Sequence, residues 1–104
     1  MAELDGQVVL VTGGGRGLGE AICRRLARAG ATAVVADVRP ELAGKVAASI
    51  RADGLKADAL TLDVTDARQA EEAVSRLAAE YDRLDVLVNN AGVDRTVSVD
   101  ELTV

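Results

Sequence analysis

The sequence contains no histidine, a single cysteine and a single aromatic residue. These scarcities bear in turn on metal binding, on disulfide formation and on the composition of the core. Without histidine the chain lacks the commonest metal ligand and the usual general base, so we expect no metal site. Cys23 alone cannot form an internal disulfide, which is compatible with a reducing compartment. Because Tyr81 is the one aromatic side chain, the core must be built from aliphatic residues.

Basic residues are also too few for a protein that binds nucleic acid or an anionic membrane. The chain holds 12 Lys and Arg against 17 Asp and Glu, a formal net charge of −5, without a basic cluster. Residues 1–10 have no basic start and no long apolar run, so they predict neither a signal peptide nor a membrane span. We therefore expect a cytoplasmic protein. Its 104 residues are the size of one small domain.

Short apolar runs alternate along the chain with stretches of helical periodicity. The runs typical of strands are 8–11, 32–37, 56–63 and 85–90. The stretches with one apolar helical face are 18–29, 41–52 and 66–81. This alternation predicts a doubly wound, Rossmann-like parallel α/β sheet with strand order 3-2-1-4. The first two helices should cover one face of the sheet and the third helix the other.

Several residues mark where these elements begin and end. Gly30 suits the left-handed conformation that ends a helix, and Pro40 suits a first helical turn. Thr65 or Asp66 can cap the third helix. The third strand alternates in polarity, which favours the edge of the sheet over its centre. After Gly92 the pattern fades, and we expect a loop.

Five glycines stand within residues 13–19, between the first strand and the first helix. Glycine lets the backbone approach a pyrophosphate closely, and the helix N-terminus offers free N–H groups to it. The spacing is not that of a G-x-x-x-x-G-K loop, because Glu20 stands where the lysine is needed. It is not G-x-G-x-x-G either, because Leu18 replaces the third glycine. The alternative is a sharp strand-to-helix turn without a ligand.

Asp37 ends the second strand, and its presence favours a dinucleotide-binding turn over a strand-to-helix turn without a ligand. In a βαβ unit a carboxylate at this point faces the adenosine ribose and accepts hydrogen bonds from its hydroxyls. It also repels a 2′-phosphate, which favours NAD over NADP. Arg16 is the opposing observation, since a basic residue in the turn can meet either that phosphate or the shared pyrophosphate. The alternative role for Asp37 is a helix cap for residues 39–41.

With two further motifs, these residues resemble the short-chain dehydrogenase/reductase family over essentially the whole chain. The motifs are T-G-x-x-x-G-x-G at 12–19, Asp37, Asp63-Val64, and N-N-A-G at 89–92. The resemblance implies that Asp37 holds the adenosine ribose, that Asp63 and Val64 flank the adenine, and that Asn89 ties neighbouring strands. The residues that it places at the pyrophosphate and nearby ribose are Gly13, Arg16, Gly17, Leu18 and Gly19. Those that it places at the nicotinamide-side ribose are Asn90, Ala91 and Gly92.

The catalytic groups of that family find no match in this chain. The resemblance implies a serine, a further asparagine and a Tyr-x-x-x-Lys pair beyond N-N-A-G. Tyr81 is followed four residues later by Asp85 instead of lysine, and we expect it to pack in the core. Ser98 lies too close to Gly92 and is expected to be a loop serine. We therefore assign no catalytic residue, and we expect residues 1–104 to form one partial dinucleotide-binding domain, incomplete relative to the family.

The resemblance implies an NAD-dependent oxidoreductase that transfers hydride between a nicotinamide and an alcohol or carbonyl. This chain would supply the cofactor-binding half and be inactive alone. The alternatives are a small nucleotide-binding module without catalysis and an interaction half that pairs with another chain. The fourth strand, apolar on both faces, lacks a partner on one edge, so we expect self-association or a missing C-terminal half.

Overall fold

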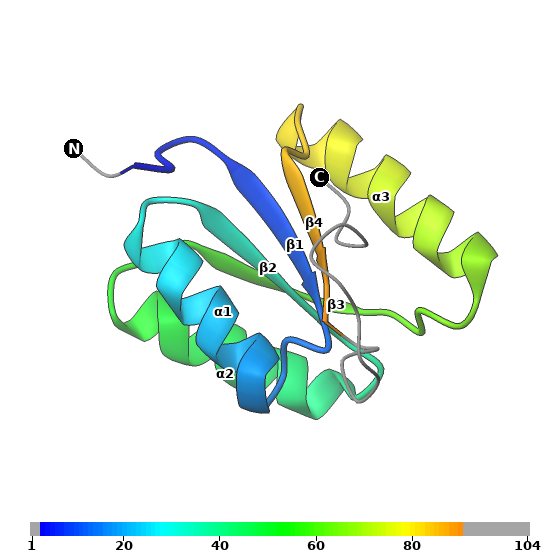
Figure 1. The fold of residues 1–104 in the computed structure, drawn as a ribbon, viewed down its shortest axis with the longest axis horizontal. Coiled ribbons are helices and arrows are strands. Elements are labelled where there is room, and N and C mark those ends of the chain that lie inside the picture. The colour runs from blue at the N-terminus through cyan, green and yellow to red at the C-terminus, as the bar shows by residue number, and fades with distance from the viewer. Residues whose placement is uncertain (1–2, 91–104) are drawn as a thin grey trace.

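The computed structural model describes residues 3–90, which form a parallel sheet with helices on both faces (Figure 1). The strands are β1 (Val8–Thr12), β2 (Thr32–Asp37), β3 (Ala57–Thr61) and β4 (Val86–Asn89). The helices are α1 (Gly17–Arg28), α2 (Pro40–Ala52) and α3 (Ala67–Tyr81). The sheet order is β3-β2-β1-β4 and every neighbouring pair is parallel. The predicted Rossmann-like topology is confirmed.

The helix boundaries follow from local chemistry. Gly30 ends the first helical segment with a φ of 102°, as its left-handed preference predicts. Pro40 occupies the first position of α2. Asp66, not Thr65, caps α3, because its Oδ1 accepts from the N–H groups of Arg68 and Gln69 at 3.1 and 3.2 Å. The third strand is shorter than the predicted run 56–63 and stands at the edge, as its polarity indicated.

The alternation of side chains along the two central strands builds a core on each face of the sheet. Val9 and Val11 face α1 and α2, whereas Val8 and Leu10 face α3. The two helices therefore lie on one face and the third on the other, as predicted (Figure 1). Cys23 is fully buried against α2's side of the sheet, and burial raises the pKa of its thiol to about 12.

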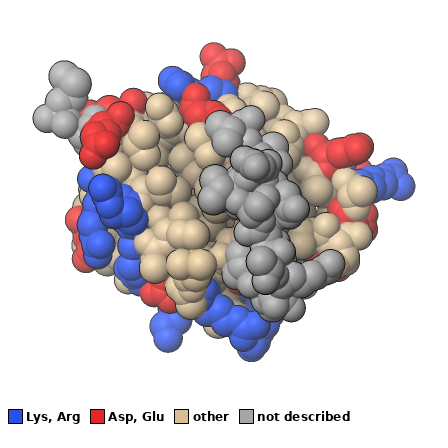
Figure 2. Space-filling model, viewed as in Figure 1, with Lys and Arg blue, Asp and Glu red and all other residues tan. Residues whose placement is uncertain are grey.

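The helical layers differ in charge. Helices α1 and α2 carry more basic than acidic residues, and α3 carries more acidic than basic ones. In Figure 2 most Lys and Arg side chains lie at the left and lower edges, on the side of α1 and α2, while side chains of both signs lie over α3. No helix among residues 3–90 is long and apolar enough to cross a bilayer.

Strand β4 stands at an edge of the described sheet but is tied to β1 at both ends. At its start the Asp85 carboxylate accepts the Val8 N–H at 2.7 Å and pairs with Arg83 at 2.6 Å. At its end the Thr12 hydroxyl lies 3.1 Å from Asn89 Oδ1 and accepts from the Asn90 N–H at 3.0 Å. These contacts fix the end of β4 beside the glycine turn that follows β1.

Candidate functional site

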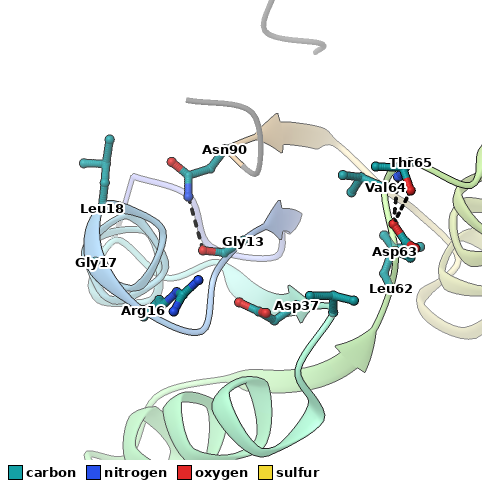
Figure 3. A pocket seen from close by; sticks show the side chains of 11 residues that line it. Gly13, Arg16, Gly17, Leu18, Asp37, Leu62, Asp63, Val64, Thr65 and Asn90 are labelled. Atoms are coloured by element: carbon teal, nitrogen blue, oxygen red, sulfur yellow. Dashed lines mark hydrogen bonds between the residues drawn. The ribbon is translucent and has the colours of Figure 1, made fainter. Parts of the chain in front are cut away.

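A cleft of about 550 Å³ lies at the carboxyl ends of the strands, where ligands bind in doubly wound sheets (Figure 3). Its walls come from the glycine turn, from the segments that follow β2 and β3, and from the end of β4. The lining residues are Gly13, Arg16, Gly17, Leu18, Asp37, Val38, Leu62, Asp63, Val64, Thr65 and Asn90. The structure thus brings together most of the residues that the sequence singled out, although they lie far apart along the chain.

Gly19 is the predicted site residue that stands behind the cleft instead of lining it. A Cβ at this position would collide with the Gly13 carbonyl oxygen, so only glycine lets α1 start this close to the turn. Gly13 itself has a φ of 64°, a left-handed conformation that glycine adopts without strain. The glycines therefore serve the shape of the turn as well as access to it.

The glycine turn is held from the side of β2. The Gly14 N–H donates to the Ala36 carbonyl at 2.8 Å, and the Gly15 N–H donates to Asp37 Oδ2 at 3.0 Å. The other carboxylate oxygen of Asp37 accepts the Arg39 N–H at 3.0 Å. Each oxygen has two lone pairs, so this buried carboxylate keeps capacity for ligand hydroxyls.

Asp37 therefore does more than the sequence predicted, and its alternative role is corrected. Helix α2 begins at Pro40 with Arg39 as its N-cap, so Asp37 lies two residues before the capping position. Its carboxylate instead joins the turn to the chain that enters α2. The sequence carried no signal for the bond to Gly15, because the bond depends on how the two loops approach each other.

The turn is held from the side of β4 by Asn90, which is 7% exposed. Its Nδ2 donates to the Gly13 carbonyl at 3.2 Å, as Figure 3 shows. Its Oδ1 is buried and has no hydrogen-bond partner among residues 3–90. An acceptor of this kind at the wall of a cleft matches a donor on a ligand, because buried polar groups are otherwise paired.

Charged groups line the cleft on two sides. The guanidinium of Arg16 and the carboxylate of Asp37 both face it (Figure 3), and Arg16 has no ion-pair partner within residues 3–90. Across the cleft, the hydroxyl and N–H of Thr65 donate to Asp63 Oδ1 at 2.6 and 3.0 Å. These hydrogen bonds lower the pKa of the Asp63 carboxyl. The cleft thus offers one cation and two carboxylates at separate places.

Three large apolar side chains stand exposed in the described part of the chain, and all three line this cleft. Leu18 and Val38 are each 60% exposed, and Val64 is 38% exposed. Apolar surface beside a few convergent polar groups is typical of a small-molecule site. Val38, like Leu62 and Thr65, was missed by sequence reasoning; its available signal was its place directly after Asp37 at a strand end.

Three predicted features remain to be placed. Ala91, Gly92 and Ser98 lie outside the described residues. Tyr81 is half-buried against the α3 side of the core, as expected, and its hydroxyl donates to Asp58 Oδ2 at 2.7 Å. Burial, aided by Asp58, raises the pKa of Tyr81. Residues 3–90 contain no group of three acidic, histidine or cysteine side chains suited to a metal ion.

Comparison with known proteins adds to this geometry. Residues 7–104 match the family model described as short chain dehydrogenase. The chain is 48% identical over 93 residues to cyclopentanol dehydrogenase of Comamonas testosteroni, covering 89% of this chain and 37% of that protein. It is 42% identical over 102 residues to meso-2,3-butanediol dehydrogenase of Serratia marcescens, covering 98% of this chain and 40% of that protein.

Solved structures are similar as well. The hydroxysteroid dehydrogenase of Escherichia coli superimposes with a TM-score of 0.79 at 32% identity, over 83% of this chain and 37% of that one. The chain therefore spans well under half the length of the proteins that it matches.

Proposed function

Because this chain belongs to the short-chain dehydrogenase family, we propose that it supplies the dinucleotide-binding part of an oxidoreductase. The reaction is hydride transfer between a nicotinamide cofactor and an alcohol or carbonyl compound. The observation that carries the proposal is the cleft in which a glycine turn at a helix N-terminus meets a strand-end carboxylate, Asp37. When bound, the nicotinamide supplies the centre that accepts or donates the hydride.

The residues of the cleft fit such a cofactor at its phosphates and at one sugar. Gly17 and Leu18 form the start of α1, whose free N–H groups suit a pyrophosphate, and Gly13 lies in the turn before it. Arg16 adds a positive charge. Asp37 accepts the hydroxyls of the adenosine ribose through the lone pairs that its bonds to backbone N–H groups leave free.

The far wall of the cleft fits a flat base. Val38 and Val64 follow neighbouring strands and present exposed apolar surface, which suits the faces of an adenine. Asp63 stands beside them at the same strand end. At the other end of the cleft Asn90 Oδ1, which has no partner among residues 3–90, suits a hydroxyl of the second ribose. Ala91 and Gly92 follow it in the sequence.

We further propose NAD as the preferred cofactor. A 2′-phosphate on the adenosine ribose would lie against the carboxylate of Asp37, and the two negative charges repel each other. Arg16 argues the other way, but its place in the glycine turn suits the pyrophosphate common to both cofactors. Titration of the protein with NADH and NADPH, followed by nicotinamide fluorescence, measures this preference directly.

The test of the overall proposal uses the full-length gene product that contains residues 1–104. It should bind NADH and oxidise secondary alcohols or diols with NAD, since relatives are named for cyclopentanol and butanediol. Residues 1–104 alone should bind NADH without turnover, because the chain has no Tyr-x-x-x-Lys pair. If the full-length protein binds NADH but turns over none of a panel of alcohols and carbonyls, the nucleotide-binding module becomes the better description.

A further inference from the structure

The loop between β3 and α3, residues 62–66, borders two hollows of the molecule. Asp63, Val64 and Thr65 line the cleft described above (Figure 3). A second cavity, of about 220 Å³, adjoins the same loop and is lined otherwise by side chains of β3 and α3. Leu62 lines both hollows. Because open space borders this loop in two places, its position depends on hydrogen bonds more than on packing.

Gln69, in the first turn of α3, makes one of these hydrogen bonds. Its Oε1 accepts the N–H of Asp63 at 3.1 Å. A backbone N–H can only donate, so the oxygen end of the Gln69 amide must face Asp63. The nitrogen end donates to Asp66 Oδ2 at 3.5 Å. The two contacts therefore agree on one orientation of the amide.

The other hydrogen bonds of Asp63 close the loop upon itself. The hydroxyl and N–H of Thr65 donate to Asp63 Oδ1, and the Asp63 carbonyl accepts the N–H of Asp66 at 3.1 Å. These bonds give the loop its local shape. Among residues 3–90, the bond to Gln69 is the one that ties Asp63 to the body of α3, which packs on the sheet through buried residues such as Leu77.

We propose that Gln69 is a positioning residue of the dinucleotide cleft, whose amide oxygen holds the Asp63 N–H and so sets the place of Asp63 and Val64. The inference rests on the proposed function in one respect, that these two residues form the wall that receives the adenine. Gln69 lines the second cavity and not the cleft, so it acts through the backbone of Asp63. A wall held in this way loses little conformational freedom when the adenine binds.

Three substitutions in α3 separate this role from a general effect on the helix. Gln69→Met removes the acceptor at similar side-chain size and leaves the exposed Asp63 N–H to water. Gln69→Glu keeps an oxygen acceptor and suits the first turn of a helix, where a negative charge is favourable. Glu72→Met is the matched control, because Glu72 lines the same cavity, and within residues 3–90 it pairs with Arg68 and makes no bond to the loop.

The expected result is measured by titration of the full-length gene product at pH 7.5 with three ligands. NADH and AMP carry the adenine, whereas reduced nicotinamide mononucleotide lacks it. Loss of one neutral hydrogen bond should weaken the binding of NADH and AMP by about 3- to 10-fold in Gln69→Met. Gln69→Glu and Glu72→Met should stay within about 2-fold of the unmodified protein for both ligands.

The ligand without adenine provides a readout that general damage to the fold would not give. A loosened fold would weaken the binding of all three ligands together. A displaced adenine wall should leave the affinity for reduced nicotinamide mononucleotide unchanged in Gln69→Met. Urea unfolding establishes that each variant is folded under the conditions of the titration.

Each outcome decides the matter. NADH affinity at the unmodified level in Gln69→Met overturns the inference, and so does an equal loss of affinity for NADH and for reduced nicotinamide mononucleotide. Binding by Gln69→Glu or Glu72→Met as weak as that by Gln69→Met overturns it too. If Gln69→Met does not fold, Gln69→Ala removes the same acceptor, and NADH affinity at the unmodified level in that variant overturns it. Failure of the unmodified protein to bind NADH or NADPH instead contradicts the proposed function.

Discussion

Replacement of Asp37 by alanine tests the two roles of this carboxylate at once. In the folded protein Asp37 accepts the N–H groups of Gly15 and Arg39, each at 3.0 Å. In the proposed complex it also accepts hydroxyls of the adenosine ribose. Asp37→Ala should therefore reduce the stability of the free protein and the affinity for NAD, and these two losses are measured separately.

The sizes of the losses follow from burial. Gly15 is buried, so its N–H loses its partner without access to water, which costs about 1–3 kcal/mol of folding stability. Arg39 is exposed and its N–H turns to water, so that bond adds little. A hydrogen bond to a charged acceptor contributes about 1.5–3 kcal/mol, so NAD should bind roughly 10- to 150-fold more weakly. NADP should lose less affinity than NAD, because its 2′-phosphate no longer meets a carboxylate.

The assay combines urea unfolding with calorimetric titration of NAD and NADP at a fixed salt concentration. Asp53→Ala is the matched control, because it makes the same substitution at the opposite end of α2, far from the cleft. An unchanged ratio of NAD to NADP affinity in Asp37→Ala would refute the assignment of Asp37 to the ribose. Tighter binding of NADP than NAD by the unmodified protein would refute it too, and would assign Arg16 to the 2′-phosphate.

Four other predictions concern separate parts of the molecule. Arg16→Ala should weaken NADH binding by about 5-fold or more, whereas Arg25→Ala, at an exposed position of the helix that Arg16 precedes, should not. Equal effects of the two substitutions in titration would remove Arg16 from the site. Tyr81→Phe should cost about 0.5–1.5 kcal/mol in urea unfolding through the lost bond to Asp58 and leave NADH affinity unchanged, a change in affinity being the contrary result. Asp85→Asn should lower the free energy of unfolding at pH 7 and make it decline less in acid. Because Arg83 lowers the pKa of Asp85, the stability that this carboxylate adds is present above its unfolded-state pKa of about 3.9 and disappears as pH falls through its lower folded-state pKa. Urea unfolding from pH 7 to pH 2 measures this difference. Residues 1–104 expressed alone should self-associate, as measured by analytical sedimentation. Within residues 3–90 the apolar strand β4 has a neighbouring strand on one side only, and its Val86, Leu87 and Val88 are half-buried. A stable monomer would contradict this expectation.

Sheet order and helix placement were predictable because they depend on long, regular patterns. Parallel strands joined by helices leave few topologies, and the handedness of the crossovers selects among them. The helical faces were long enough to show their period, from Ala43 to Ile50 in α2 for example. Element ends were predicted within a few residues, since Gly30, Pro40 and Asp66 each have a preference that acts locally.

The contacts within the cleft were harder to predict because they join distant segments. Asn90 and Gly13 lie 77 positions apart, and their composition does not reveal which end of the amide faces the turn. Val38 gave a weak signal, because a valine after a strand is equally compatible with a buried position. Only the fold shows that it is 60% exposed and lines the same cleft as Val64.

The glycine turn is held at three successive residues by groups that do not belong to it. Asn90 binds the carbonyl of Gly13, the Ala36 carbonyl accepts the N–H of Gly14, and Asp37 accepts the N–H of Gly15. A turn fixed in this way before its ligand arrives loses little conformational freedom on binding, which favours affinity. Asp37 and Asn90 act on the same short segment from opposite sides. Their contributions to cofactor binding are therefore expected to be coupled instead of additive.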